Sequence, residues 1–103
     1  MTEKEYNIYM KYVLIKSRHI HNDIDNIPAI FEDSIQPAQI FDFDYHKKII
    51  HSKLNNKDTL TLYVTGLTPL LISVLNYCKL FGIAVLLYHY DTDGKCYRPQ
   101  SVI

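Results

Sequence analysis

The chain is poor in the residues that characterise several classes of protein. Its 103 residues include two cysteines, three glycines, four prolines and no tryptophan. Cys78 and Cys96 form no Cys-x-x-Cys pair, so the sequence lacks a redox motif and is typical of a cytoplasmic protein with reduced thiols. The scarcity of glycine and proline excludes long linkers and low-complexity tracts.

The chain also has no excess of charge and no long apolar run. Eleven basic residues balance eleven acidic ones, giving a formal net charge of zero. Binding to duplex nucleic acid depends on a basic surface, so a duplex is not an expected partner. No run approaches the roughly 20 apolar residues that cross a bilayer, and the first residues contain no signal-peptide core. We therefore expect no membrane association.

What the sequence does contain indicates one α/β domain over residues 1–103. Hydrophobic residues make up 48% of the chain, enough for a single core. Their spacing predicts strands at 9–16, 37–44, 58–64, 83–90 and 96–102, and helices at 22–33, 45–56 and 68–81. This alternation predicts a small Rossmann-like three-layer sandwich, with helices on both faces of a mostly parallel sheet and a C-terminal antiparallel edge hairpin. A ferredoxin-like α+β sheet is the alternative, if the second strand runs antiparallel.

Two of these elements have distinctive patterns. The strand at 83–90 is apolar almost without interruption, which is typical of a strand buried on both faces. The helix at 68–81 is apolar nearly all round, so we expect other elements to cover most of its sides. His46 and His51 are predicted to lie on the surface of the helix at 45–56.

The stretch "YVTGLTP" is the point at which a strand changes into a helix. Gly66 permits a tight turn, Thr68 is predicted to be the N-cap, and Pro69 suits the first helical position. Such a junction needs these residue types for its geometry alone. The same geometry also offers free backbone N–H groups to a phosphate, beyond the carboxyl end of a strand where α/β folds bind ligands. Both interpretations stay open.

A second polar loop follows the first strand. Ser17, Arg18 and His19 are expected at the same edge of the sheet as Thr65 and Thr68. Together the two loops provide a guanidinium, an imidazole and three hydroxyls next to a helix start. This combination suits a nucleotide or another phosphate ligand, although neither a P-loop nor a GxGxxG pattern is present.

"LYVTGLTP", followed by a helix and "IAVLLYHYD", resembles the strand–TGGT–helix–strand signature of CRISPR-associated Rossmann-fold (CARF) domains. That family includes small ring nucleases that bind and cleave cyclic oligoadenylate second messengers in antiviral signalling. The similarity covers about residues 59–91, with a looser match at "KSRH". Here Leu67 replaces the family's second glycine, and Thr68-Pro69 replaces its Thr-Lys. The resemblance implies a ligand loop formed by Thr65, Gly66, Leu67 and Thr68, with Ser17 and Arg18 in the other ligand loop.

The resemblance also implies a mechanism without a metal or another cofactor. The ribose 2′-hydroxyl would attack the neighbouring phosphate while Arg18 offsets the developing charge and His19 transfers protons. The partners implied are a cyclic oligonucleotide and a second copy of the chain, with the ring on the two-fold axis of a homodimer.

Two other interpretations remain. His89 and Asp91 point the same way at the carboxyl end of the strand at 83–90, where Asp91 could orient His89 beside a ligand or could simply begin the hairpin turn. With His19 and His21 they could instead serve a different hydrolase or a metal-dependent nuclease. A non-enzymatic module is also possible, docking on a larger protein through the apolar residues 70–81.

Overall fold

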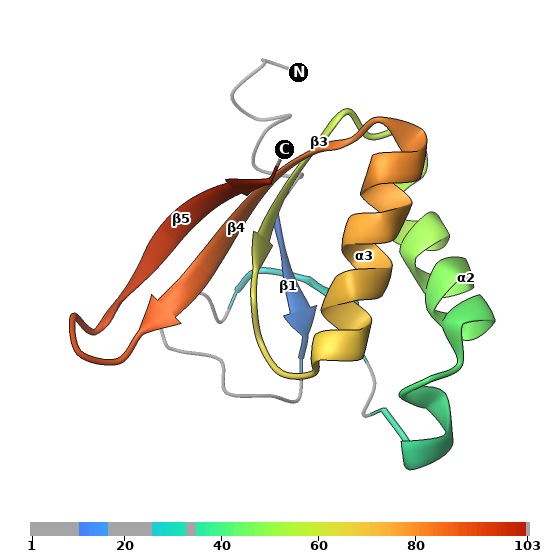
Figure 1. Ribbon diagram of the computed structural model, residues 1–103, viewed down its shortest axis with the longest axis horizontal. Helices are drawn as coiled ribbons and strands as arrows, with labels where there is room; N and C mark the ends of the chain where they lie inside the picture. The colour runs from blue at the N-terminus through green and yellow to red at the C-terminus, as the bar shows by residue number, and fades with distance from the viewer. Residues whose placement is uncertain (1–10, 17–25, 33–34, 103) are drawn as a thin grey trace.

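The computed structural model describes residues 11–16, 26–32 and 35–102 (Figure 1). Its elements in chain order are β1 (Lys11–Ile15), β2 (Ala29–Phe31), a 3₁₀ turn η2 (Pro37–Gln39), α2 (Phe43–Leu54), β3 (Thr59–Tyr63), α3 (Thr68–Phe81), β4 (Ala84–Asp91) and β5 (Cys96–Val102). Within these residues, neither α-helix has the length and apolar character that a bilayer-spanning helix requires.

The five strands form one mixed sheet in the order β2-β1-β3-β4-β5. The first four are mutually parallel, and β5 pairs antiparallel with β4, as predicted for the C-terminal edge hairpin. The α/β fold expected from the sequence is therefore confirmed. The ferredoxin-like alternative is excluded, because β2 runs parallel to β1 and does not reverse.

The second strand lies earlier in the chain than predicted. Ala29–Phe31 is a strand where a helix was expected, and all three residues are buried. The predicted strand at 37–44 is wrong: it consists of η2 followed by the start of α2. The physical reason lies at Asp42, whose carboxylate accepts a hydrogen bond from the Tyr45 N–H at 3.1 Å and so caps α2.

Helices α2 and α3 pack against each other on the same face of the sheet (Figure 1). The crossovers from β2 to β3 and from β3 to β4 both move across the sheet in the same direction. Right-handed crossovers in one direction place their helices on one face. The described residues thus show one helical layer where two were expected. Residues 17–25, between β1 and β2, lie outside the described part.

The main core lies between this helical layer and the sheet. In β3, Leu60 and Leu62 are buried while the alternate residues are not, and β4 buries Val85 and Leu87 in the same way. Since the other positions of β4 are half-buried or exposed, the expectation that this strand is buried on both faces is wrong. Gly82 ends α3 in the left-handed conformation (φ 69°), as its place in the sequence predicted.

Candidate functional site

The best candidate for a ligand site is the carboxyl edge of β1 and β3. These strands are parallel neighbours, but the chain leaves β1 towards β2 on one side and leaves β3 towards β4 on the other. The sheet order therefore reverses between them. In open α/β sheets ligands bind in the crevice at such a switch point, outside the carboxyl ends of the strands.

Thr65 joins the two strands at this switch point. The Ile15 N–H donates to Thr65 Oγ1 at 3.0 Å, and the Thr65 hydroxyl donates to the Ile15 carbonyl at 2.9 Å. Thr65 is only 4% exposed. Its hydroxyl is thus occupied by the backbone of β1, so Thr65 holds the edge together and does not present a free hydroxyl to a ligand.

The residues after Thr65 form the start of α3. Gly66 adopts φ 87°, a conformation that side-chain-bearing residues rarely adopt, and is exposed. Leu67 is the N-cap of α3, so Thr68 is the first helical residue and not the N-cap that the sequence predicted. Leu67 has no side-chain oxygen with which to cap the helix. Thr68 is exposed, and its N–H belongs to the first turn, whose N–H groups have no partner within a helix.

Three of the predicted site residues, Ser17, Arg18 and His19, lie outside the described residues. The residues immediately before them are described. Ile15 bonds to Thr65, and the exposed Lys16 donates its N–H to the Phe31 carbonyl at 3.1 Å. The loop that carries Arg18 therefore starts at the switch point, next to the loop 65–68.

His89 and Asp91 belong to the β4–β5 hairpin, which extends away from the start of α3 (Figure 1). Asp91 Oδ1 accepts the N–H groups of Asp93 (3.0 Å) and Gly94 (3.1 Å), and Oδ2 pairs with Arg98. The Arg98 hydrogen bond first, and the Gly94 N–H second, lower the pKa of Asp91. Asp91 therefore begins the hairpin turn.

The sequence analysis considered Asp91 as the partner of the His89 imidazole, but the structure gives His89 a different partner. His89 Nε2 lies 2.8 Å from Gln100 Oε1 on β5. The contact crosses from β4 to β5, where His89 and Gln100 lie near each other in the antiparallel register. His89 and Asp91 thus each bond to a residue of β5, and both serve the hairpin.

His46 occupies a position that the sequence analysis missed. It is fully buried, not on the helix surface: Nε2 lies 2.7 Å from the Gln39 carbonyl and Nδ1 lies 2.8 Å from Ser73 Oγ. A carbonyl can only accept, so Nε2 carries a proton and, in the neutral ring, Nδ1 accepts from the Ser73 hydroxyl. The spacing of His46, Ile50 and Leu54, four residues apart, was the available signal.

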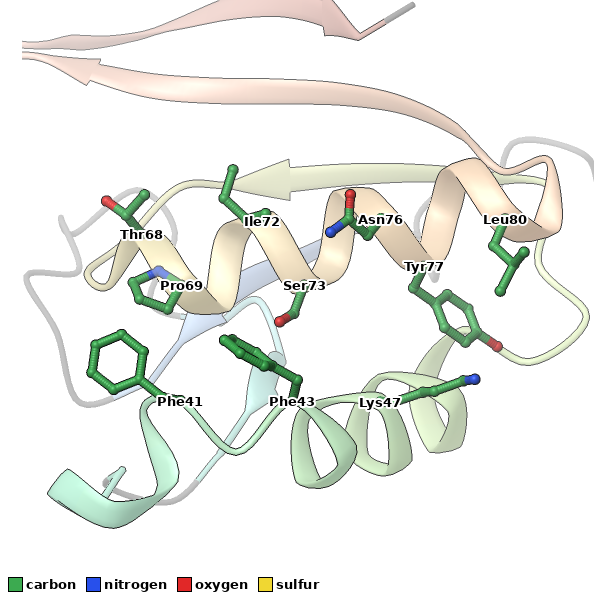
Figure 2. A pocket seen from close by; sticks show the side chains of 10 residues that line it. All are labelled: Phe41, Phe43, Lys47, Thr68, Pro69, Ile72, Ser73, Asn76, Tyr77 and Leu80. Atoms are coloured by element: carbon green, nitrogen blue, oxygen red, sulfur yellow. The ribbon is translucent and has the colours of Figure 1, made fainter.

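An apolar groove of about 610 Å³ lies between α2 and α3 on the side away from the sheet (Figure 2). Phe41 and Phe43 form one wall together with Lys47, and the α3 residues from Thr68 to Leu80 form the other. Phe41 is 68% exposed, Phe43 61% and Leu80 68%. The expectation that α3 is covered on most sides is thus wrong for the face that carries Ile72 and Leu80.

The described residues contain no group of three or more His, Cys, Asp or Glu side chains that could hold a metal ion. The two cysteines are far from equivalent. Cys78 is buried in α3, and burial raises the pKa of its thiol to about 11, whereas Cys96 is exposed on β5. The histidines His19 and His21 of the alternative metal site lie outside the described part of the chain.

Comparison with known proteins identifies no relative of this chain. No protein-family model matches the chain, and neither a curated protein nor a solved structure shows significant similarity to it.

Proposed function

We propose that the protein binds a cyclic oligoadenylate at the switch point between β1 and β3. The observation that carries this proposal is the pair of hydrogen bonds between Ile15 and Thr65. They hold together the starts of the two loops that the CARF resemblance assigns to the ligand. Each loop was located from sequence separately, and the sheet order supports their convergence on one edge.

The chemistry of this edge suits a phosphate. A helix start whose N-cap has no side-chain oxygen offers N–H groups and the positive end of the dipole of a 14-residue helix. Gly66 lets the ligand approach the backbone closely, because it has no side chain. Arg18, two residues after Lys16, would supply the cation that the family's lysine provides and that Pro69 cannot.

The same proposal includes cleavage of the bound ring. The ribose 2′-oxygen attacks the adjacent phosphorus, the bond from phosphorus to the 5′-oxygen breaks, and a 2′,3′-cyclic phosphate and a 5′-hydroxyl result. His19 accepts the 2′-hydroxyl proton and delivers it to the leaving 5′-oxygen, and Arg18 stabilises the charge on the phosphorane. No metal or oxidant is needed, since every proton and electron pair stays within the substrate and these side chains.

Thr68→Glu tests the placement of the ligand. A carboxylate at the first turn is favourable for the helix itself, so the fold should persist. The same carboxylate should repel a bound phosphate and weaken binding on the order of tenfold or more, ~1.4 kcal/mol. Isothermal calorimetry with the cyclic oligoadenylate that wild type binds best measures this loss.

Thr59→Glu is the matched control. Thr59 is also exposed, but it begins β3, the strand that leads to this loop, and so lies at the opposite edge of the sheet. It should leave binding unchanged. An equal loss of affinity in both variants would contradict a site at the start of α3, and so would unchanged affinity in both. Arg18→Ala and His19→Ala then separate binding from cleavage, since the second should keep the ring bound but intact.

A non-enzymatic binding module is the second candidate function. The observation that favours it is the exposure of large apolar side chains along the α2–α3 groove, which a monomer rarely leaves uncovered.

A further inference from the structure

The α2–α3 groove has the shape of a seat for one more helix. His46 of α2 bonds to Ser73 of α3, and about one turn further along both helices His51 bonds to Tyr77, so the two walls run in the same direction. The α3 residues that line the groove fall within 68–80, about 18 Å along the helix axis (Figure 2). A helix of about three turns has this length, and side chains of one helix pack into the furrows beside another.

The hydroxyls inside the groove already have partners in the protein. The Ser73 hydroxyl bonds to His46, and the Tyr77 hydroxyl lies 2.8 Å from His51 Nδ1. The remaining surface is mostly apolar, and its largest exposed side chains are Phe41, Phe43, Ile72 and Leu80. We expect an occupant to present an apolar face, because a polar face would lose its water there without gaining hydrogen bonds.

The backbone of the occupant points to a helix. An extended peptide on this surface would leave its own N–H and C=O groups without partners, since the backbone groups of α2 and α3 bond within each helix. A helix satisfies its backbone groups internally. A small molecule fits less well, because sites for small molecules enclose roughly 70–90% of their ligand. Here the large apolar side chains are 48–68% exposed, so the groove is open.

The charge around the groove favours an acidic occupant. Lys47 is the one charged residue among the described residues that line it. Lys79 is exposed and follows the lining residue Asn76 by three positions, so it lies on the same outer side of α3. The ion pairs of the described residues involve Lys53 and Arg98, so within that part of the chain neither Lys47 nor Lys79 has an acidic partner. Helices α2 and α3 contain four lysines and one aspartate, although the whole chain has no net charge.

We propose that the groove binds an acidic amphipathic helix of a partner protein. The partner helix presents apolar residues at i, i+4, i+7 and i+11, which fill the space between the walls, and aspartate or glutamate on both edges of this stripe. One edge faces Lys47 on α2 and the other faces Lys79 on α3. The inference names the class of partner for the second candidate function, on which it rests, and it does not depend on nucleotide binding.

The first test uses two labelled synthetic peptides of about 15 residues. Both carry leucine at the four apolar positions and alanine elsewhere, and their edge positions are all glutamate in one and all lysine in the other. Fluorescence anisotropy with the full chain in ~50 mM salt measures their affinities, because surface charges are only partly screened there. The acidic peptide should bind at least about tenfold more tightly, since it gains ion pairs where the other meets like charges. Equal affinities, or no binding of the acidic peptide, would overturn the proposal.

A change of charge in the groove tests the contact with α2. Lys47→Glu should weaken binding of the acidic peptide several-fold and strengthen binding of the lysine peptide. Lys48→Glu is the matched control: it makes the same change at the next residue of α2, which is exposed but does not line the groove. This variant should keep most of the preference for the acidic peptide. Equal effects of the two substitutions would mean that Lys47 does not contact the partner helix, contrary to the proposal.

Leu80→Asp tests whether the apolar groove itself is the site. This variant should bind the acidic peptide at least about tenfold more weakly than wild type, with an unchanged circular dichroism spectrum. Val102→Asp is the matched control, because Val102 is also an exposed apolar residue, 37% exposed, but lies on β5 away from the groove. It should bind the peptide as wild type does. Binding that survives Leu80→Asp would place the peptide elsewhere and overturn the proposal.

Two other occupants are tested with the same variant. Wild type should not sediment with vesicles of phosphatidylserine and phosphatidylcholine, and it should be monomeric by sedimentation equilibrium at about 50 µM. Vesicle binding that Leu80→Asp abolishes would assign the groove to a membrane surface, and a dimer that it abolishes would assign the groove to a second copy; either result overturns the proposal. All these measurements omit nucleotide, so a failure here leaves cyclic oligoadenylate binding to be judged by its own experiment.

Discussion

Thr65→Val is expected to lower the free energy of unfolding by about 2–4 kcal/mol, since an unpaired buried N–H or C=O costs roughly 1–3 kcal/mol. Valine has nearly the shape of threonine but can neither accept from the Ile15 N–H nor donate to the Ile15 carbonyl. Both groups belong to a residue that is 1% exposed, so water cannot replace the lost hydroxyl. Urea unfolding followed by circular dichroism measures the change.

Thr68→Val is the control for this prediction. Thr68 carries the same side chain three residues later, but it is exposed and its hydroxyl does not cap the helix. Its replacement should change stability by no more than about 0.5 kcal/mol. If both substitutions have the same small effect, Thr65 does not hold β1 and β3 together at the proposed site.

His46→Leu is expected to destabilise the protein by about 2–5 kcal/mol, because it removes both hydrogen bonds of a fully buried side chain at once. Leucine fills much of the space of the imidazole, which limits the cavity. The Gln39 carbonyl and the Ser73 hydroxyl would both lose their partner at His46. Because Ser73 lies on α3 and Gln39 lies in η2, this change loosens the helical layer and with it one wall of the groove. Urea unfolding measures the loss of stability.

The double variant His46→Leu, Ser73→Ala separates hydrogen bonding from packing. Replacing both members of a polar pair by apolar residues is often nearly neutral, so the double variant should recover part of the loss. His51→Leu is the matched control, since His51 is exposed on the same helix and its Nδ1 bonds to the Tyr77 hydroxyl at 2.8 Å. Additive losses in the double variant would show that His46 and Ser73 do not act as a pair.

The second half of the fold was predictable from sequence because its signals are local. The strand at 58–64, the helix that begins near Thr68 and the glycine at its end each follow from periodicity and capping within a few residues. Residues 22–44 were misassigned for a physical reason. A three-residue strand such as β2 is too short to show alternation, and the alternating Phe41 and Phe43 flank a helix cap at Asp42.

The candidate site was only partly predictable. The edge at which Gly66 and Thr68 lie follows from the parallel order of the strands, which the sequence pattern indicated. The role of Thr65 depends on a contact 50 residues away in the chain, and that of His46 on a contact 27 residues away. The groove is formed jointly by residues of α3 and by residues at and before the start of α2, so the apolar sequence of α3 alone could not show which side stays uncovered.

The most direct test of ligand binding at the switch point is thermal unfolding of the purified chain with cyclic tri-, tetra- and hexa-adenylate, each followed by chromatography of the incubated ring. One ring size should raise the unfolding temperature, since a ligand at 100 times its Kd adds about 2.7 kcal/mol of stability, and linear products should appear. A shift without products would limit the protein to binding. No shift with any of the three rings would contradict the proposed function.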